Sequence, residues 1–170
     1  MMIEDVRDPL TGVWSRFGLL FFAEQHVKLL RRVKREAILF VVGIEGLPTD
    51  GTLEPAHEAG VREAARLLRR TFRTSDAVAR VESGVFAVLL LETSPLAADG
   101  LRCRLEDRLV QWREEHPDVP PLSLSMVVDR IIADQEMSFL DVLSRNVATL
   151  HDQWAAGAGS NGGSPLAQEW

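Results

Sequence analysis

The stretch Val81-Glu82-Ser83-Gly84-Val85-Phe86 decides the fold of this chain, because it lies between two apolar runs. Residues 76–80 precede it and residues 87–91 follow it, and both runs have the length of a β-strand. Ser83-Gly84 between them is typical of a tight two-residue turn. The stretch therefore predicts a β-hairpin.

The flanking sequence predicts helices and strands on both sides of this hairpin. Residues 8–16 read as a loop, and Ser138 is expected to cap the last helix. Residues 37–44 are continuously apolar without a helical period, which predicts a strand buried on both faces. The other expected elements are helices from residue 16 to about 36, 54–72, 95–115 and 138–154, and a strand over 122–128.

This order contains one β-α-β-β-α-β unit of ferredoxin-like topology. We therefore expect an α+β fold with a mainly antiparallel central sheet, and helices covering one face of it.

Composition limits the classes of function. The 170 residues, 46% hydrophobic, suit one domain, and the apolar runs are too short to span a membrane. The acidic N-terminus lacks the basic region of a signal peptide, so the cytoplasm is the expected location. The net charge of -6 argues against nucleic acid as a partner. The single cysteine, Cys103, excludes an internal disulfide.

Common catalytic and cofactor motifs are not found in the sequence. Cys103 and the four histidines (His26, His57, His116 and His151) show no metal-ligand spacing. The chain has neither a phosphate-binding glycine-rich loop nor a Gly-x-Ser-x-Gly motif. No catalytic residue, metal ligand or cofactor is therefore expected.

Five short motifs, in order, resemble the GGDEF domain of diguanylate cyclases. Residues 8–16 read Asp-Pro-Leu-Thr-Gly-Val-Trp-Ser-Arg, close to that family's opening Asp-x-Leu-Thr-Gly-Leu-x-Asn-Arg. The other four lie at residues 40–47, 56–60, 73–80 and 121–125. The resemblance implies a palm-type, degenerate GGDEF domain over residues 8–154, with a short lead over 1–7 and a flexible tail over 155–170.

The resemblance also implies that the cyclase chemistry is lost. The two metal-binding acids of the family fall at Gly43 and Gly84, and its late phosphate-contacting lysine falls at Trp154. Its two turn glycines and two guanine contacts are also replaced, at Glu82, Ser83, Gly51 and Val61. Since phosphoryl transfer depends on positioning and charge neutralisation, we expect no cyclase activity. The competing interpretation is a displaced Mg²⁺ site formed by Glu45 and Glu82.

One ligand site of the family is retained in the sequence. Its inhibitory Arg-x-x-Asp pair, which binds cyclic di-GMP, falls at Arg73 and Asp76, and a second arginine falls at Arg104. A guanidinium group can grip phosphate or guanine with two hydrogen bonds. The structural alternative is that Arg73 complements the helix dipole and pairs locally with Asp76.

Three functions are open at this point. The first is a cyclic di-GMP receptor that acts through homodimerisation or a protein partner. The second is a nucleotide-independent scaffold, which would use an apolar patch around Gly43, Gly46, Leu47, Val61 and Val85. The third, an enzyme with an altered substrate, conflicts with the missing carboxylates.

Overall fold

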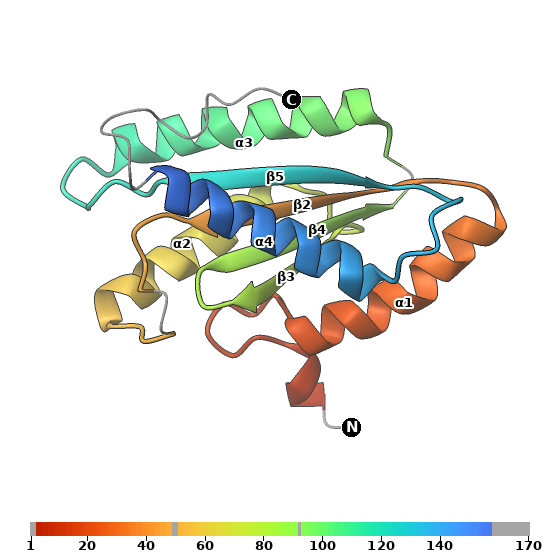
Figure 1. Cartoon of the computed structure of the whole chain (residues 1–170). Helices are drawn as coiled ribbons and strands as arrows, with labels where there is room; N and C mark the ends of the chain where they lie inside the picture. The colour runs from red at the N-terminus through yellow and green to blue at the C-terminus, as the bar shows by residue number, and fades with distance from the viewer. Residues whose placement is uncertain (1–2, 49–50, 92, 158–170) are drawn as a thin grey trace.

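The computed structural model describes residues 3–48, 51–91 and 93–157 (Figure 1). The first elements are a 3₁₀ turn, η1 (Ile3–Val6), the short β1 (Trp14–Ser15), α1 (Arg16–Arg32), β2 (Ala37–Ile44) and α2 (Pro55–Thr71). The hairpin and the C-terminal half follow, with β3 (Ala77–Glu82), β4 (Val85–Leu91), α3 (Pro95–Glu115), β5 (Leu124–Ile131) and α4 (Phe139–Gly157).

The five strands form one mixed sheet in the order β1-β3-β4-β2-β5. β1 pairs with β3 in parallel, and every other pair is antiparallel. The segment from β2 to β5 has the expected β-α-β-β-α-β order, and β3 and β4 form the expected hairpin. The predicted α+β class and mainly antiparallel sheet are confirmed.

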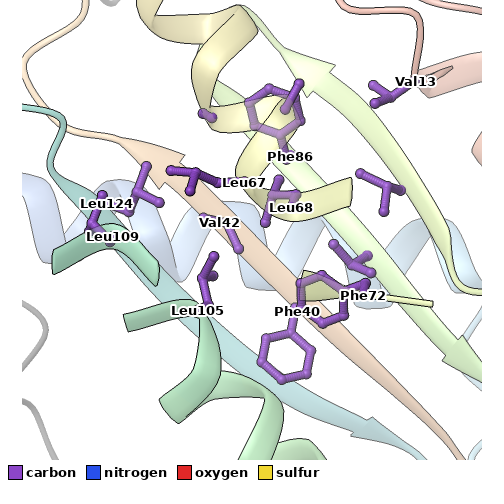
Figure 2. Close-up of a cluster of buried hydrophobic side chains, with 14 of the residues drawn as sticks. Val13, Phe40, Val42, Leu67, Leu68, Phe72, Phe86, Leu105, Leu109 and Leu124 are labelled. Atoms are coloured by element: carbon purple, nitrogen blue, oxygen red, sulfur yellow. The ribbon is translucent and has the colours of Figure 1, made fainter. Parts of the chain in front are cut away.

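The helices cover both faces of the sheet, so the expectation that they cover one face is wrong. All eight residues of β2 are buried, and alternate side chains point to opposite layers. Phe40 and Val42 pack in one cluster with residues of α2 and α3, as Figure 2 shows. Leu39 and Val41 belong to a second cluster with residues of α1 and α4. A continuously apolar strand requires two covered faces.

Three element boundaries differ from the expected ones. α1 ends at Arg32 rather than near residue 36, because Lys34 adopts a left-handed conformation with φ of 53°. β5 covers 124–131 rather than 122–128, since it follows the full length of β2 from Ile44 to Ala37.

The last helix, α4, also differs from its expected end. The amide of Asp141 donates to Oγ of Ser138 over 3.1 Å, which confirms the predicted cap. α4 continues to Gly157, so residues 155–157 of the predicted tail are helical. The rest of that tail lies outside the described residues. Across those residues, no helix combines the length and the hydropathy needed to cross a membrane.

Candidate functional site

Trp154 of α4 occupies the space beside Gly43, near the end of β2. A Cβ atom at Gly43 would clash with Cζ2 of Trp154 and would lie 2.6 Å from Cδ2 of Leu150. Real Cβ atoms do not approach other heavy atoms this closely. The position that the resemblance assigned to a metal-binding acid is therefore covered by an indole ring.

Hydrogen bonds hold this indole ring in place. Nε1 of Trp154 donates to Oγ of Ser125 over 2.8 Å, and this hydroxyl donates to Oε1 of Glu45 over 2.6 Å. Ser125 is buried on β5, directly opposite Gly43 in the β2–β5 register. The chain of hydrogen bonds thus joins α4, β5 and the end of β2.

The hairpin turn is covered in the same way. A Cβ atom at Gly84 would clash with Cδ1 of Leu47. Glu82, at the end of β3, forms a 2.9 Å hydrogen bond with Nε2 of His151 on α4. The His151 ring stacks on Trp154 with centroids 5.4 Å apart. The hairpin and α4 are therefore in direct contact through their side chains.

Glu45 and Glu82 take part in different contacts, Glu45 with Ser125 and Glu82 with His151. Across the described residues, no three His, Cys, Asp or Glu side chains gather in a way that could hold a metal ion. The geometry thus gives no support to the displaced Mg²⁺ site considered from the sequence.

A cleft of about 380 Å³ remains between the hairpin and α4. Its lining, which we call the hairpin cleft, consists of Ile44, Leu47, Pro48, Gly51, Glu82, Ser83, Gly84, Val85, His151 and Trp154. None of these described lining residues is a lysine or an arginine, and Glu82 adds a carboxylate. This composition disfavours a phosphate group.

The exposed apolar patch expected from the sequence is not formed. Gly43, Val61 and Val85 are buried, and Leu47 is half-buried over Gly84. Gly46 alone of the five expected residues is exposed. The patch fails because Trp154 and Leu150 cover Gly43, while Val61 and Val85 are buried in the clusters on opposite faces of the sheet.

A buried ion pair links the N-terminal loop to the hairpin. Nη1 of Arg80 lies 3.0 Å from Oδ1 of Asp8, and both side chains are largely buried. Nε of the same arginine donates to the carbonyl of Ser83 over 3.0 Å. Arg80 therefore fixes the hairpin turn to the loop that precedes β1.

Arg73 and Asp76 form a compact turn between α2 and β3. Oδ2 of Asp76 accepts from the amide of Arg73 over 2.9 Å, and the Arg73 side chain is exposed. Burial raises the pKa of Asp76, and the amide and charge of Arg73 offset only part of that rise. The net pKa is above the usual value, so the amide and charge of Arg73 do not fully compensate the burial of this carboxylate.

Arg104 is exposed on α3, which packs beside α2. Nε1 of Trp112 donates to Glu63 over 3.1 Å, while Arg70 and Arg108 line one pocket. Residue 63 of α2 thus lies beside residue 112 of α3, and residue 70 beside residue 108. The residue numbers rise along one helix as they fall along the other, so the two helices run antiparallel. Arg104 therefore faces the end of α2 that leads to Arg73. The ligand-binding roles of Arg73, Asp76 and Arg104 stay predictions.

Two residues that bond to the side chains around the hairpin cleft, His151 in its lining and Ser125 beside it, were not singled out from the sequence. His151 was grouped with scattered histidines, and Ser125 was read only as part of a strand motif. The spacing of His151 and Trp154, three residues apart in a helix, places both on one face and could have indicated a shared contact. No local signal identifies Ser125, because its partners are distant in sequence.

No protein-family model matches this sequence, and no curated protein matches it, but solved structures share its fold. The FimX GGDEF domain from Pseudomonas aeruginosa is 22% identical, with a TM-score of 0.72 over 86% of this chain and 92% of that one. The GGDEF domain of DgcB from Caulobacter crescentus, solved in complex with c-di-GMP, is 16% identical, with a TM-score of 0.75 over 92% of each chain.

A third similar structure contains a protein partner. The diguanylate cyclase SiaD from Pseudomonas aeruginosa, in complex with its activator SiaC, is 19% identical, with a TM-score of 0.74. The match covers 91% of this chain and 61% of SiaD. At these identities the likeness establishes a fold, and that fold is the one of GGDEF domains.

Proposed function

We propose that this chain is a catalytically inactive GGDEF-like regulatory domain that binds cyclic di-GMP through Arg73, Asp76 and Arg104. It acts through protein–protein contact, as a homodimer or with another protein. The position of Trp154 over Gly43 carries the first part of this proposal. An indole ring there leaves no room for a carboxylate, and phosphoryl transfer needs metal ions to neutralise charge.

The lining of the hairpin cleft supports the same conclusion. A nucleoside triphosphate would bring several negative charges next to Glu82, and none of the described lining residues is a lysine or an arginine. The test is to incubate the purified protein with GTP and Mg²⁺ and to analyse the products by chromatography. We expect no cyclic di-GMP, and formation of this product would overturn the proposed inactivity.

The receptor role rests on the turn that holds Arg73 and Asp76. The guanidinium group of Arg73 is exposed, and Asp76 is a half-buried acceptor with a raised pKa. A ligand that donates hydrogen bonds to this carboxylate would supply the compensation it lacks. The carboxylate and guanidinium groups together fit the N–H edge and the phosphates of a guanine dinucleotide.

Isothermal titration with cyclic di-GMP tests the receptor role. We expect saturable binding that Arg73→Ala abolishes. Arg62→Ala is the matched control, because Arg62 is exposed on α2 and pairs with Glu58 in the same helix. Unchanged binding in Arg73→Ala would place the ligand elsewhere.

A nucleotide-independent scaffold is the second candidate, and the outer face of α1 favours it. Phe17 and Phe21, one turn apart, are 49% and 54% exposed. An exposed aromatic pair is typical of a protein contact. The double substitution Phe17→Ser with Phe21→Ser should abolish self-association in analytical ultracentrifugation if this face forms a homodimer. Absence of cyclic di-GMP binding in the titration would favour the scaffold.

A further inference from the structure

The surface between α2 and α3 carries arginines that form no ion pair with an acid in the part of the chain that the structure describes. Arg70 and Arg108 line a groove of about 430 Å³, together with Leu67, Gln111, Trp112 and Glu115. We call this the arginine groove. Because the helices are antiparallel, Arg104 lies one turn further along α3, toward the end of α2 from which the chain continues to Arg73.

Several arginines elsewhere in this acidic chain are paired with carboxylates. Arg62 pairs with Glu58, Arg80 with Asp8, and Arg102 with Asp99 and Glu106. Within residues 3–48, 51–91 and 93–157, the guanidinium groups of Arg70, Arg73, Arg104 and Arg108 form no ion pair or hydrogen bond. Arg70 and Arg108 therefore bring two such cations to one groove.

The helix dipole explains only part of this arrangement. Arg70 lies in the last turn of α2, where a cation is favourable on its own. Arg108 lies in the interior of α3, two turns before its end, where the dipole contributes little. Arg108 is half-buried, and an anion between the guanidinium groups of Arg70 and Arg108 would be attracted by both charges.

The acid in the groove does not neutralise these arginines. Oε1 of Glu115 accepts a hydrogen bond from Gln111 over 2.9 Å. Glu115 follows Arg108 by seven residues, which is roughly 10 Å along a helix. Within the lining of the groove, Arg108 and Glu115 therefore lie about two turns apart along α3, which leaves room for an anion at the Arg70–Arg108 end.

We propose that Arg70 and Arg108 form a phosphate-binding site in the arginine groove, next to Arg73 and Arg104. The guanidinium forks match phosphate geometry and give charge-assisted hydrogen bonds. The recognised chemistry is a phosphate group, supplied by a cyclic dinucleotide, by a linear dinucleotide or by inorganic pyrophosphate. The site does not depend on the proposed binding of cyclic di-GMP through Arg73 and Asp76.

Isothermal titration with inorganic pyrophosphate, at ionic strength held constant with chloride, tests this site directly. We expect Arg70→Gln and Arg108→Gln each to weaken binding roughly tenfold, as expected for loss of a charge-assisted hydrogen bond. Arg62→Gln, on the same helix as Arg70, should change it less than twofold. Circular dichroism of each variant confirms that the fold is kept. No binding of pyrophosphate by the wild type, or an equal loss in Arg62→Gln, would overturn the proposal.

Titrations with cyclic di-GMP and linear diguanylate separate this site from the proposed receptor function. If Arg70 and Arg108 are needed for pyrophosphate while cyclic di-GMP does not bind, the arginine groove stands and the receptor function fails. If Arg73→Gln abolishes cyclic di-GMP binding while Arg70→Gln and Arg108→Gln bind all three probes as the wild type does, the arginine groove fails and the receptor function stands. Equal losses for the linear and cyclic dinucleotides in Arg108→Gln support recognition of phosphate itself.

Discussion

The hairpin cleft and the arginine groove lie in the same domain but are built in opposite ways. In the hairpin cleft, side chains of the protein satisfy one another: Trp154 covers Gly43, and His151 bonds to Glu82. In the arginine groove, Arg70 and Arg108 face the same space without a described acidic partner. The first region is closed by internal contacts, and the second exposes charge.

This difference indicates where a ligand would gain most. A ligand entering the hairpin cleft must replace existing hydrogen bonds and ring contacts, so much of its binding energy is offset. A phosphate in the arginine groove meets guanidinium groups that form no ion pair or hydrogen bond within the described residues, and it is attracted by both charges. The variants below test this comparison, from the largest expected effect to the smallest.

Gly43→Ala should cause the largest loss of stability. The added methyl group would clash with Trp154 in a buried layer, and overpacking of this kind costs about 2–3 kcal/mol. Urea denaturation followed by circular dichroism measures the change. Gly60→Ala is the control: no atom lies within 4 Å of its Cβ position, and alanine in a helix should add up to about 1 kcal/mol of stability.

Combining Gly43→Ala with Trp154→Ala sharpens this test. Removal of the indole ring relieves the clash with Trp154 and leaves only the one with Leu150, so the double variant should be more stable than the sum of the two single losses predicts. The coupling energy should be at least about 1 kcal/mol. Strict additivity would show that the ring and residue 43 do not exclude each other.

Ser125→Ala should have the next largest effect. It removes the hydroxyl that bridges Trp154 and Glu45, and it leaves a partly buried indole N–H without that partner. The expected loss is about 1–2 kcal/mol. Ser123→Ala is a nearby control, because its side chain forms no hydrogen bond within the described part of the chain. An equal change in both variants would contradict the bridging role.

Asp129→Asn tests how firmly α4 is held over the hairpin cleft. Burial raises the pKa of Asp129, but hydrogen bonds from Asn146, Arg145 and the amide of Arg130 lower it by a larger amount. The net pKa of Asp129 is therefore below the usual value. The ionised group therefore stabilises the fold above about pH 4, and this contribution is lost as pH falls through the lowered pKa. The variant should be less stable than the wild type at pH 7 and equal to it at low pH. A constant difference across pH would contradict the assignment.

Asp76→Asn should show a smaller change of the opposite sign. Burial raises the pKa of Asp76 in the folded protein. As pH rises, this carboxyl group therefore loses its proton at a lower pH in the unfolded chain than in the folded protein. The wild type therefore loses stability between about pH 4 and the raised folded pKa, and the variant does not. Asparagine should be the more stable residue at pH 7 and should lose this advantage at low pH. Lower stability of the variant at pH 7 would contradict the raised pKa.

Much of the fold could be predicted because its signals are local. Ser83-Gly84 marks the hairpin turn, and the apolar run of β2 marks a strand buried on both faces. Helix ends were harder to predict. The end of α1 depends on the left-handed backbone conformation of Lys34, which has no sequence signature. The end of β5 depends on its pairing with β2, a contact distant in sequence.

The candidate site was less predictable than the fold. The sequence shows which residues are missing, such as carboxylates at Gly43 and Gly84, but it does not show what replaces them. The covering of Gly43 by Trp154 joins residues more than a hundred positions apart. Arg70 and Arg108 likewise come to line one groove only when α2 and α3 pack side by side. Such contacts follow from tertiary structure and not from spacing along the chain.

The ion pair between Asp8 and Arg80 has a mechanical consequence. Arg80 also bonds to the carbonyl of Ser83, so a single guanidinium group joins the N-terminal loop to the hairpin tip. Parallel strands β1 and β3 lie beside it. A displacement of residues 3–8 would therefore be passed to the hairpin tip through Arg80, and to the start of α1 through the bond from Oγ of Ser15 to the carbonyl of Asp5.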